Sequence, residues 1–455
     1  MTTHEPDVAI VGAGTGGCYA AATIARAGYD VTIVERKSQD EAGHIACGDA
    51  LKGADAFPEA IPKSAIEPAF TNTDVDHGRF EIPQENAVLD IPVPGELAVI
   101  DRLEFGKLII DGAEQAGAAV HYDTVVQDVI QDDGRVTGLR ATREGDPVEY
   151  RGDVVIDAAG ALSILQDKAT LDEATFDTNV SYSQFSSAYR EVLEVDSPVE
   201  WDDALVLKPT ERAAGYLWYF PRTSTEINVG LGFQMGEEPM ELVESLKRDL
   251  RTRPEFEGAE VKDKLGAALP TRRPYDSGIA PGFMAIGDAA GHVNPTTGGG
   301  IAGAAYAGKY AGEAAIEAIE TGDTSETGLW TYNERVMDHF GGRYAALDVY
   351  NILVGATGLD DLMGLLATLP AEKLSDALYS GSANVGLGLK LRTAVKSFGH
   401  WGTLHDLYRT KSEADRLLDH YEDYPDHPNE FDTWQAQRDG LMDVVYATTG
   451  ADAKY

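Results

Sequence analysis

A glycine-rich turn close to the N-terminus sets narrow limits on the fold of this chain. The turn occupies residues 12–17 and reads Gly-Ala-Gly-Thr-Gly-Gly. It follows a short apolar run at 7–11, and it leads into a segment of small residues at 16–27 and a second apolar run at 30–35. The spacing GxGxxG between a strand and a helix of a βαβ unit is the dinucleotide-binding fingerprint. The sequence therefore predicts a Rossmann-type α/β domain.

Each glycine of this turn answers a separate physical demand. Gly12 permits the tight turn, Gly14 lets the backbone approach a pyrophosphate, and Gly17, next to Gly16, allows the helix to pack closely on the strand. The phosphates would lie at the helix N-terminus, where free N–H groups and the dipole favour anions. Glu35 ends the second apolar run, where an acid accepts hydrogen bonds from a ribose diol and disfavours a 2′-phosphate. These residues predict a site for the ADP half of FAD or NAD.

A second motif lies nearly 300 residues further along the chain. Phe283–Asp288 is an apolar run that ends in Gly-Asp, and Gly298–Ile301 opens a long predicted helix. With Asp101-Arg102 at a helix start and the strand-plus-glycine run Val154–Gly160, these segments resemble the para-hydroxybenzoate-hydroxylase-like flavoproteins.

The resemblance implies FAD as the cofactor and assigns roles to several residues. It implies that Asp288 binds the ribityl chain and that Arg102 lies along the pyrophosphate. It also places Gly300 and Ile301 at a helix N-terminus beneath the flavin pyrimidine, where the dipole would stabilise an anionic reduced ring. Val126, in a predicted β-meander over 118–140, completes the predicted flavin-binding set.

Further motifs narrow the family. They are the runs Ala46–Leu51, Tyr216–Pro221, Asn228–Gly232 and Gly291–Pro295. Together they resemble the archaeal geranylgeranyl reductase family, which saturates the isoprenoid chains of membrane lipids. The resemblance covers about residues 5–330.

The family resemblance implies where substrate and flavin would meet. Cys47, Gly48 and Ala50 would line the flavin and the substrate entrance. Tyr216, Trp218 and Phe220 would form part of an apolar tunnel for the prenyl chain, since alternate residues of a strand face the same side. The alternative interpretation is that these aromatic residues belong to a buried core sheet and that Cys47 is a small buried hydrophobe.

The implied chemistry delivers a hydride and a proton to an unactivated alkene. Positive charge that develops on carbon would be stabilised by an aromatic face, the role expected of Trp218. Cys47 and Tyr216 are the candidate proton donors. Cys18, in the first helix, is expected only to pack, and His292 is interpreted as a turn histidine at a helix entrance.

The charge and the cysteine content restrict partners and location. Asp plus Glu number 76 against 37 for Lys plus Arg, a net charge of −39 that is spread along the chain. Such a surface repels nucleic acid. It also indicates a protein from the cytoplasm of a halophile, where molar salt screens the repulsion among its own carboxylates. Two cysteines exclude a disulfide framework, and we predict no metal site. No apolar run is long enough to span a bilayer, so we expect a cytoplasmic protein with, at most, peripheral membrane contact.

Several alternatives stay open at this stage. The rivals are an aromatic hydroxylase or a halogenase of the same superfamily, a quinone-reducing dehydrogenase and a non-catalytic flavoprotein. Halogenases have a Trp-x-Trp-x-Ile-Pro motif where this chain has Tyr-Leu-Trp-Tyr-Phe-Pro, and two cysteines cannot ligate an iron–sulfur cluster. The prenyl substrate could be a digeranylgeranylated glycerophospholipid, geranylgeranyl diphosphate or a quinone tail. The electron donor could be NAD(P)H or a ferredoxin.

The pattern of elements predicts three regions. We expect a discontinuous FAD-binding domain from 1–66, 99–165 and 270–325, and a substrate domain around an antiparallel sheet from 67–98 and 166–269. A helical C-terminal region is expected over 326–455, with no catalytic motif.

Overall fold

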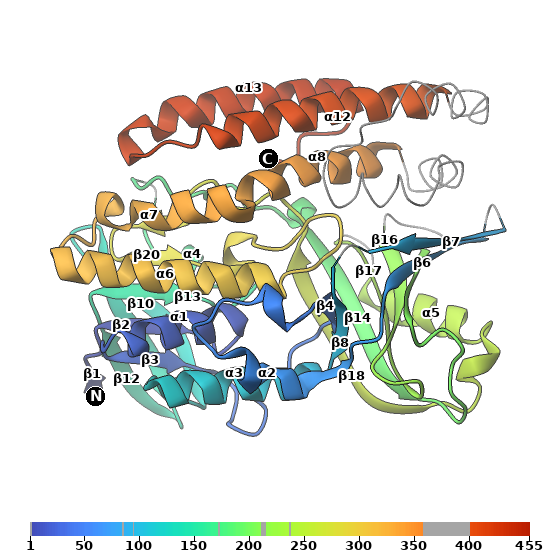
Figure 1. The fold of residues 1–455 in the computed structure, drawn as a ribbon. Helices are drawn as coiled ribbons and strands as arrows, with labels where there is room; N and C mark the ends of the chain where they lie inside the picture. The colour runs from blue at the N-terminus through green and yellow to red at the C-terminus, as the bar shows by residue number, and fades with distance from the viewer. Residues whose placement is uncertain are drawn as a thin grey trace.

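The computed structural model describes residues 2–83, 86–93, 95–171, 173–210, 215–235, 238–357 and 401–455. Figure 1 shows an elongated molecule, with a sheet-and-helix body at one end, a large twisted sheet at the other, and long C-terminal helices laid across the top. The predicted α/β class with a second, sheet-based part and a helical C-terminal region is confirmed.

The core of the first part is a six-stranded sheet in the order β19-β20-β13-β2-β3-β9. Its strands are β2 (Val8–Val11), β3 (Val31–Val34), β9 (Ala119–His121), β13 (Val154–Asp157), β19 (Ile279–Ala280) and β20 (Phe283–Ala285). All pairs are parallel except β19 with β20. The strands are short apolar runs because both faces of the sheet are covered.

Helices cover one face of this sheet and a second sheet covers the other. The helices are α1 (Thr15–Arg26), α3 (Arg102–Ala116) and α6 (Ile301–Thr321). The covering sheet has the order β1-β12-β11-β10, from β1 (Thr2–His4), β10 (Thr124–Asp132), β11 (Arg135–Arg143) and β12 (Asp146–Arg151). Alternate residues of β2 separate the two layers: Val8 and Ile10 pack with the helices, and Ala9 and Val11 with the covering sheet.

The second part is a seven-stranded sheet in the order β18-β14-β17-β16-β15-β6-β7. Its strands are β6 (His77–Ile82), β7 (Ala87–Pro92), β14 (Phe185–Glu194), β15 (Ala204–Pro209), β16 (Gly215–Pro221), β17 (Glu226–Gln234) and β18 (Glu260–Pro270). The predicted antiparallel sheet is correct except between β6 and β15, which pair in parallel because β6 arrives from a segment far earlier in the chain. Helix α5 (Pro239–Leu250) packs on the face that carries Leu217 and Tyr219.

A small three-stranded sheet lies at the junction of the two parts. It pairs β4 (Ala50–Lys52) and β5 (Phe70–Asn72) with β8 (Leu97–Ile100). The predicted boundary at 99 falls within β8, and the one at 66 falls at the end of α2 (Lys63–Ile66), just before β5. That division of the chain stays a prediction.

The C-terminal region is helical where it is described. Its long helices are α7 (Glu326–Val336), α8 (Gly342–Thr357), α12 (Trp401–Glu422) and α13 (Phe431–Thr449), with a π-helical turn over Met337–Gly341. Figure 1 shows α12 and α13 side by side above α8 and α7, which in turn lie over α6. Among the described residues, no helix is both long and apolar enough to cross a bilayer.

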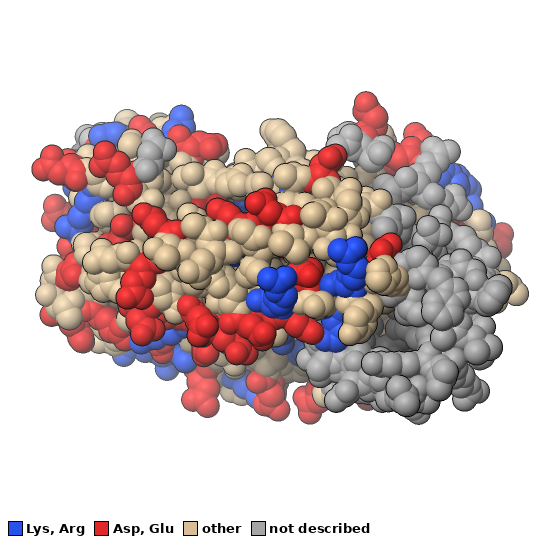
Figure 2. Space-filling model, turned by 90° about the horizontal axis from the view of Figure 1, so that it is seen from above, with Lys and Arg blue, Asp and Glu red and all other residues tan. Residues whose placement is uncertain are grey.

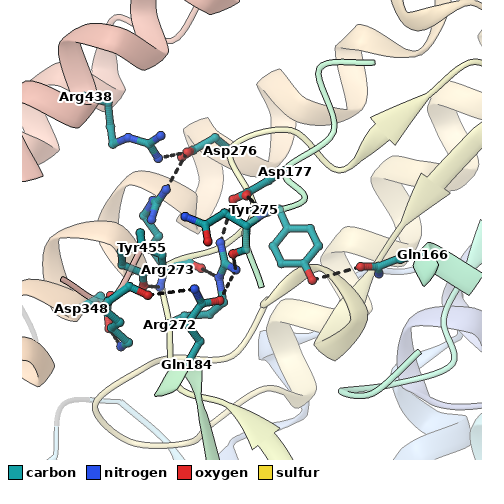
Figure 3. Close-up of polar contacts among 12 residues, drawn as sticks. Gln166, Asp177, Gln184, Arg272, Arg273, Tyr275, Asp276, Asp348, Arg438 and Tyr455 are labelled. Atoms are coloured by element: carbon teal, nitrogen blue, oxygen red, sulfur yellow. Dashed lines mark hydrogen bonds and ion pairs between the residues drawn. The ribbon is translucent and has the colours of Figure 1, made fainter. Parts of the chain in front are cut away.

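Buried charges fasten these helices to the body. Asp276 lies on the connection that precedes β19. Figure 3 shows it facing Arg273, from the same connection, and Arg438, from α13. Arg272 lies beside them and donates to Asp177 over 2.7 Å. Burial alone would raise the pKa of Asp177, but Arg272 and Arg273 outweigh it and hold that pKa below its usual range. The C-terminal region is therefore held to the body by ion pairs inside the protein.

Candidate functional site

The fingerprint turn has the geometry that its glycines predict. Gly12 has a φ of +99°, and a Cβ there would lie 2.5 Å from the carbonyl oxygen of Ala158. A Cβ on Gly17 would lie 2.1 Å from the carbonyl oxygen of Gly12, so the helix packs on the turn as expected. Gly14 differs, because a Cβ there would meet only Ile45 Cδ1, at 4.0 Å. The backbone at Gly14 therefore faces open space, as the approach of a pyrophosphate requires.

The start of α1 adds unpaired donors to this turn. Gly14 is the N-cap, no side chain caps the helix, and its first turn carries no acidic residue. Arg102, on α3, is 3% exposed and places Nη2 3.4 Å from Thr15 Oγ1, while its Nη1 has no hydrogen-bond partner. A buried guanidinium nitrogen beside free helix N–H groups leaves donors for an anion. The residues present fit the pyrophosphate of a dinucleotide.

Glu35 is buried and already holds the turn. Its Oε2 accepts from the N–H of Ala13 over 2.8 Å, and its Oε1 accepts from the N–H of Lys37 over 2.9 Å. Each carboxylate oxygen has a further lone pair, so these bonds leave acceptors for a ribose hydroxyl. Val126 lies on β10, where its side chain is buried in the apolar cluster that includes Val34. Its predicted contact with the cofactor stays a prediction.

The second motif faces the same region from the other side. Asp288 follows β20, and its Oδ1 would lie 3.6 Å from a Cβ on Gly300, the N-cap of α6. Burial raises the pKa of Asp288 to about 6, and Arg102 acts in the opposite direction. Helix α6 starts at Ile301, three residues later than the predicted 298, because Gly298 has a φ of +69° and ends the preceding turn. Like α1, it has no side-chain cap, so its first N–H groups are free for a ligand.

His292 has a structural role in this turn. It is 2% exposed, and its Nδ1 accepts from the N–H of Gly287 over 3.1 Å. Burial lowers its pKa to about 3, so the ring is neutral at physiological pH. These contacts agree with the interpretation as a turn histidine.

The loop that carries Cys47 and Gly48 lies against the aromatic strand. Tyr216, Trp218 and Phe220 lie in one apolar cluster on the face of β16 opposite α5, which also includes Ala50 of β4. A Cβ on Gly48 would lie 3.3 Å from Phe220 Cε2 and 3.4 Å from Trp218 Nε1. Glycine at 48 therefore lets the loop touch the aromatic wall. Trp218 and Phe220 are only 7% and 9% exposed. This burial fits both interpretations of the sequence, the wall of a substrate tunnel and the core of a sheet.

The two candidate proton donors keep their protons at neutral pH. Burial raises the pKa of Cys47 to about 11, and the Asp49 carboxylate adds to the rise. Burial, with a smaller contribution from Cys47, raises the pKa of Tyr216 to about 12. The Tyr216 hydroxyl donates to the carbonyl of Thr297 over 2.6 Å, which places it beside the glycine turn before α6. Cys18, in contrast, is fully buried in α1 and places its Sγ 3.4 Å from the carbonyl oxygen of Ala13.

A buried polar network behind this wall was missed by the sequence reasoning. Asp49 is fully buried and accepts from Arg222 Nε over 2.8 Å, and Arg222 Nη2 lies 2.7 Å from the same oxygen. Asn228, also fully buried, donates to Asp49 over 2.5 Å and accepts from Trp218 Nε1 over 2.9 Å. A signal was present, since Asn228 is a polar residue within an apolar strand and Asp49 lies inside the Cys-Gly motif. Their pairing depends on a contact between segments about 180 residues apart.

Comparison with known proteins agrees with this geometry. Residues 5–340 match the family described as FAD binding domain. A digeranylgeranylglycerophospholipid reductase of Methanothrix thermoacetophila is 32% identical over 387 residues, 83% of this chain and 95% of that protein. A protein of the same name from Sulfolobus acidocaldarius is 27% identical over 449 residues, 97% of this chain and 98% of that protein.

Solved structures give the same result. A geranylgeranyl bacteriochlorophyll reductase-like protein from Thermoplasma acidophilum matches with a TM-score of 0.72 and 25% identity, covering 91% of this chain and all of that one. A p-nitrophenol 4-monooxygenase from Pseudomonas putida matches at a TM-score of 0.62 and 16% identity, covering 87% of this chain and 97% of that one, and shares the fold alone. The chain therefore belongs to the FAD-binding family that includes the digeranylgeranylglycerophospholipid reductases, and its cofactor is FAD.

Proposed function

We propose that this protein is an FAD-dependent reductase that saturates C=C bonds of the geranylgeranyl chains of a glycerophospholipid. The observation that carries the proposal is the 32% identity to a reductase of that name over 95% of its length. The apolar wall beside the flavin-side loop supports it, because a prenyl chain needs an apolar surface next to the cofactor. The fold is shared with a brominase and a monooxygenase, so the fold alone does not choose between these activities.

The chain's own residues would divide the work in three parts. The glycine turn, Arg102 and Asp288 would hold FAD, whose reduced form supplies a hydride to the alkene. Trp218 and Phe220 would shield the prenyl chain from water and stabilise the positive charge that develops on its carbon. The carbon that accepts the hydride must lie about 3–3.5 Å from the atom that donates it, and a rigid wall would hold the prenyl chain at that distance.

The proton would come from the end of the wall near α6. Tyr216 and Cys47 are both protonated at neutral pH, and Tyr216 lies at this end. An acid whose pKa lies far above the working pH has little driving force for transfer, so the positive charge that forms on carbon as the alkene accepts the proton must be stabilised by the aromatic wall. We propose Tyr216 as the donor, because its hydroxyl is fixed by Thr297.

Membrane contact and the electron donor belong to the same proposal. A lipid substrate requires peripheral contact with the cytoplasmic face of a membrane. The reductant would dock transiently, as NAD(P)H or a ferredoxin, because the GxGxxG turn at 12–17, which joins a strand to a helix in a βαβ unit, is assigned to FAD. We propose the discontinuous division into FAD-binding, substrate and helical regions as the frame for these roles.

An anaerobic half-reaction tests the proposal. The protein is purified in high salt, its flavin is reduced with dithionite, and digeranylgeranylglyceryl phosphate is added. Flavin reoxidation, with the lipid gaining two hydrogens per bond, is the expected result, and the fully saturated lipid serves as the control. A flavin that stays reduced with an unchanged lipid would refute the proposal.

Two sets of variants assign the residues in this assay. Glu35→Ala and Asp288→Ala are expected to lose FAD on gel filtration. Trp218→Ala is expected to retain FAD and to lose lipid reduction. Full lipid reduction by Trp218→Ala would remove the wall from the substrate site.

A further inference from the structure

One side chain joins the two surfaces that meet at the proposed reaction site. Asn228 is fully buried on β17, and both ends of its amide are bonded. Its Oδ1 accepts from the indole Nε1–H of Trp218 over 2.9 Å, and its Nδ2 donates to the carbonyl oxygen of Cys47 over 2.9 Å. The same Nδ2 donates to Asp49 over 2.5 Å. The amide thus uses its donor end on the loop and its acceptor end on the aromatic wall.

The remaining anchors of the loop act away from the indole. Arg222 holds the Asp49 carboxylate from the end of β16, and the carbonyl oxygen of Asp49 accepts from the N–H of Ile100 over 3.0 Å. Asp49 has a φ of +70°, so the loop turns sharply just after Gly48 and depends on side-chain contacts to keep that shape. These bonds fix the position of the loop, whereas Asn228 links the loop to the ring of Trp218.

We propose that Asn228 is a positioning residue for prenyl reduction, which sets the distance between the Trp218 ring and the Cys47–Gly48 loop. This inference rests on the proposed function. Gly230, opposite Trp218 across the strand pair, supports it, because a Cβ there would lie 2.3 Å from Trp218 Cζ2. The indole therefore lies flat over β17, with its Nε1–H directed along the sheet to Asn228. Within the part of the chain that the structure describes, no other side chain hydrogen-bonds both the indole and the loop.

The expected consequence concerns rate more than affinity. A displacement of about 1 Å at a hydride-transfer site can cost roughly 100-fold in rate, while an apolar chain still finds most of its contacts. Asn228→Ala should therefore lower the limiting rate of flavin reoxidation by the lipid about 10- to 100-fold. The lipid concentration at half-maximal rate should change far less.

The test compares Asn228→Ala with a matched control, Asn72→Ala, on β5. Asn72 donates through Nδ2 to the carbonyls of Pro221 and Asp202, both at 2.9 Å, so it is also an asparagine amide that anchors this region. Neither of these two bonds goes to the loop or to the indole, and Asn72→Ala should keep the wild-type rate. Trp218→Phe removes the indole N–H and keeps an aromatic ring, and it should slow the same step. The double variant Asn228→Ala/Trp218→Phe should be no slower than Asn228→Ala, because both changes remove one interaction.

Thiol labelling gives a readout that does not depend on turnover. Cys18 is fully buried, whereas Cys47 is partly accessible and is protected by its raised pKa. Maleimide labelling of Cys47 in the apoprotein should accelerate severalfold in Asn228→Ala and stay unchanged in Asn72→Ala. If Asn228→Ala does not fold, Trp218→Phe decides alone, through its reoxidation rate.

The outcomes separate this inference from the function on which it rests. A wild-type protein that leaves the lipid unchanged refutes the proposed function. An active wild type, with unchanged reoxidation and labelling in Asn228→Ala, refutes the positioning role alone. An equal loss of rate in Asn72→Ala would also refute it, because the effect would then be general to the asparagine amides that anchor this region.

Discussion

A single buried carboxylate should control how firmly the C-terminal helices hold to the body. Asp276 is fully buried, and its Oδ2 lies 3.1 Å from Arg273 Nη2 and also accepts from Arg438 of α13. Its Oδ1 accepts from the hydroxyl of Tyr421 on α12. Figure 3 shows Arg273 and Arg438 reaching Asp276 from different elements. Asp276→Asn keeps the shape of the side chain and removes its charge.

The magnitude follows from the burial of the two cations. Arg273 and Arg438 are 2% and 3% exposed, so the substitution leaves two guanidinium groups inside the protein without this counter-charge. Removing one partner of a buried ion pair costs about 3–5 kcal/mol. That cost corresponds to roughly a 100-fold to several thousand-fold rise in the population of the state in which α12 and α13 are detached, at about 1.4 kcal/mol per tenfold. Because a whole chain is typically stable by only about 5–15 kcal/mol, the variant should also melt earlier.

Hydrogen exchange followed by mass spectrometry measures this change directly. Peptides from α13 should lose protection in Asp276→Asn, while peptides from β2 and α1 should not. Asp439→Asn is the matched control, because Asp439 pairs with the same Arg438 at 3.0 Å but its side chain is 67% exposed. An exposed pair contributes about 0–1 kcal/mol, so this control should exchange almost as wild type does. Unchanged protection of α13 in Asp276→Asn, or an equal loss in both variants, would refute the reasoning.

Three further predictions concern the cofactor site and the surface. Burial raises the pKa of Asp288 in the apoprotein to about 6, so the carboxylate that would accept hydrogen bonds from the ribityl hydroxyls is lost as pH falls through 6. The affinity for FAD should therefore fall below pH 6, and Asp288→Asn should remove this dependence in fluorescence titrations. A wild-type affinity that is constant from pH 5 to 8 would contradict the assignment. Gly308→Ala should release FAD and lower the melting temperature, because a Cβ there would lie 2.2 Å from the carbonyl oxygen of Gly16 where α6 crosses α1. The control is Gly322→Asn, which should retain FAD on gel filtration, because Gly322 has a φ of +70° and a Cβ there would meet nothing within 4 Å. Figure 2 shows acidic side chains scattered over one face, and with a net charge of −39 the melting temperature should rise steadily from 0.2 to 3 M KCl; a melting temperature that is independent of salt would argue against a halophilic adaptation.

The nucleotide half of the site could be predicted from local sequence because its chemistry is local. Gly12, Gly14 and Gly17 lie within one turn, and their backbone geometry follows from spacing alone. The start of α6 was predicted three residues too early, because a run of glycines permits both a left-handed turn and a helix start. The parallel pairing of β6 with β15 was missed, since it joins strands more than 100 residues apart.

The sequence by itself determined that this chain binds a dinucleotide and that the cofactor is flavin. These properties depend on short motifs, in which backbone conformation and hydrogen bonding are fixed by neighbours in the chain. Only the tertiary structure showed that Asp49, Arg222 and Asn228 form one network, and that Asp276 ties the C-terminal helices to the body. Such contacts depend on burial, which makes an unpaired polar group costly and which no single segment of sequence reveals.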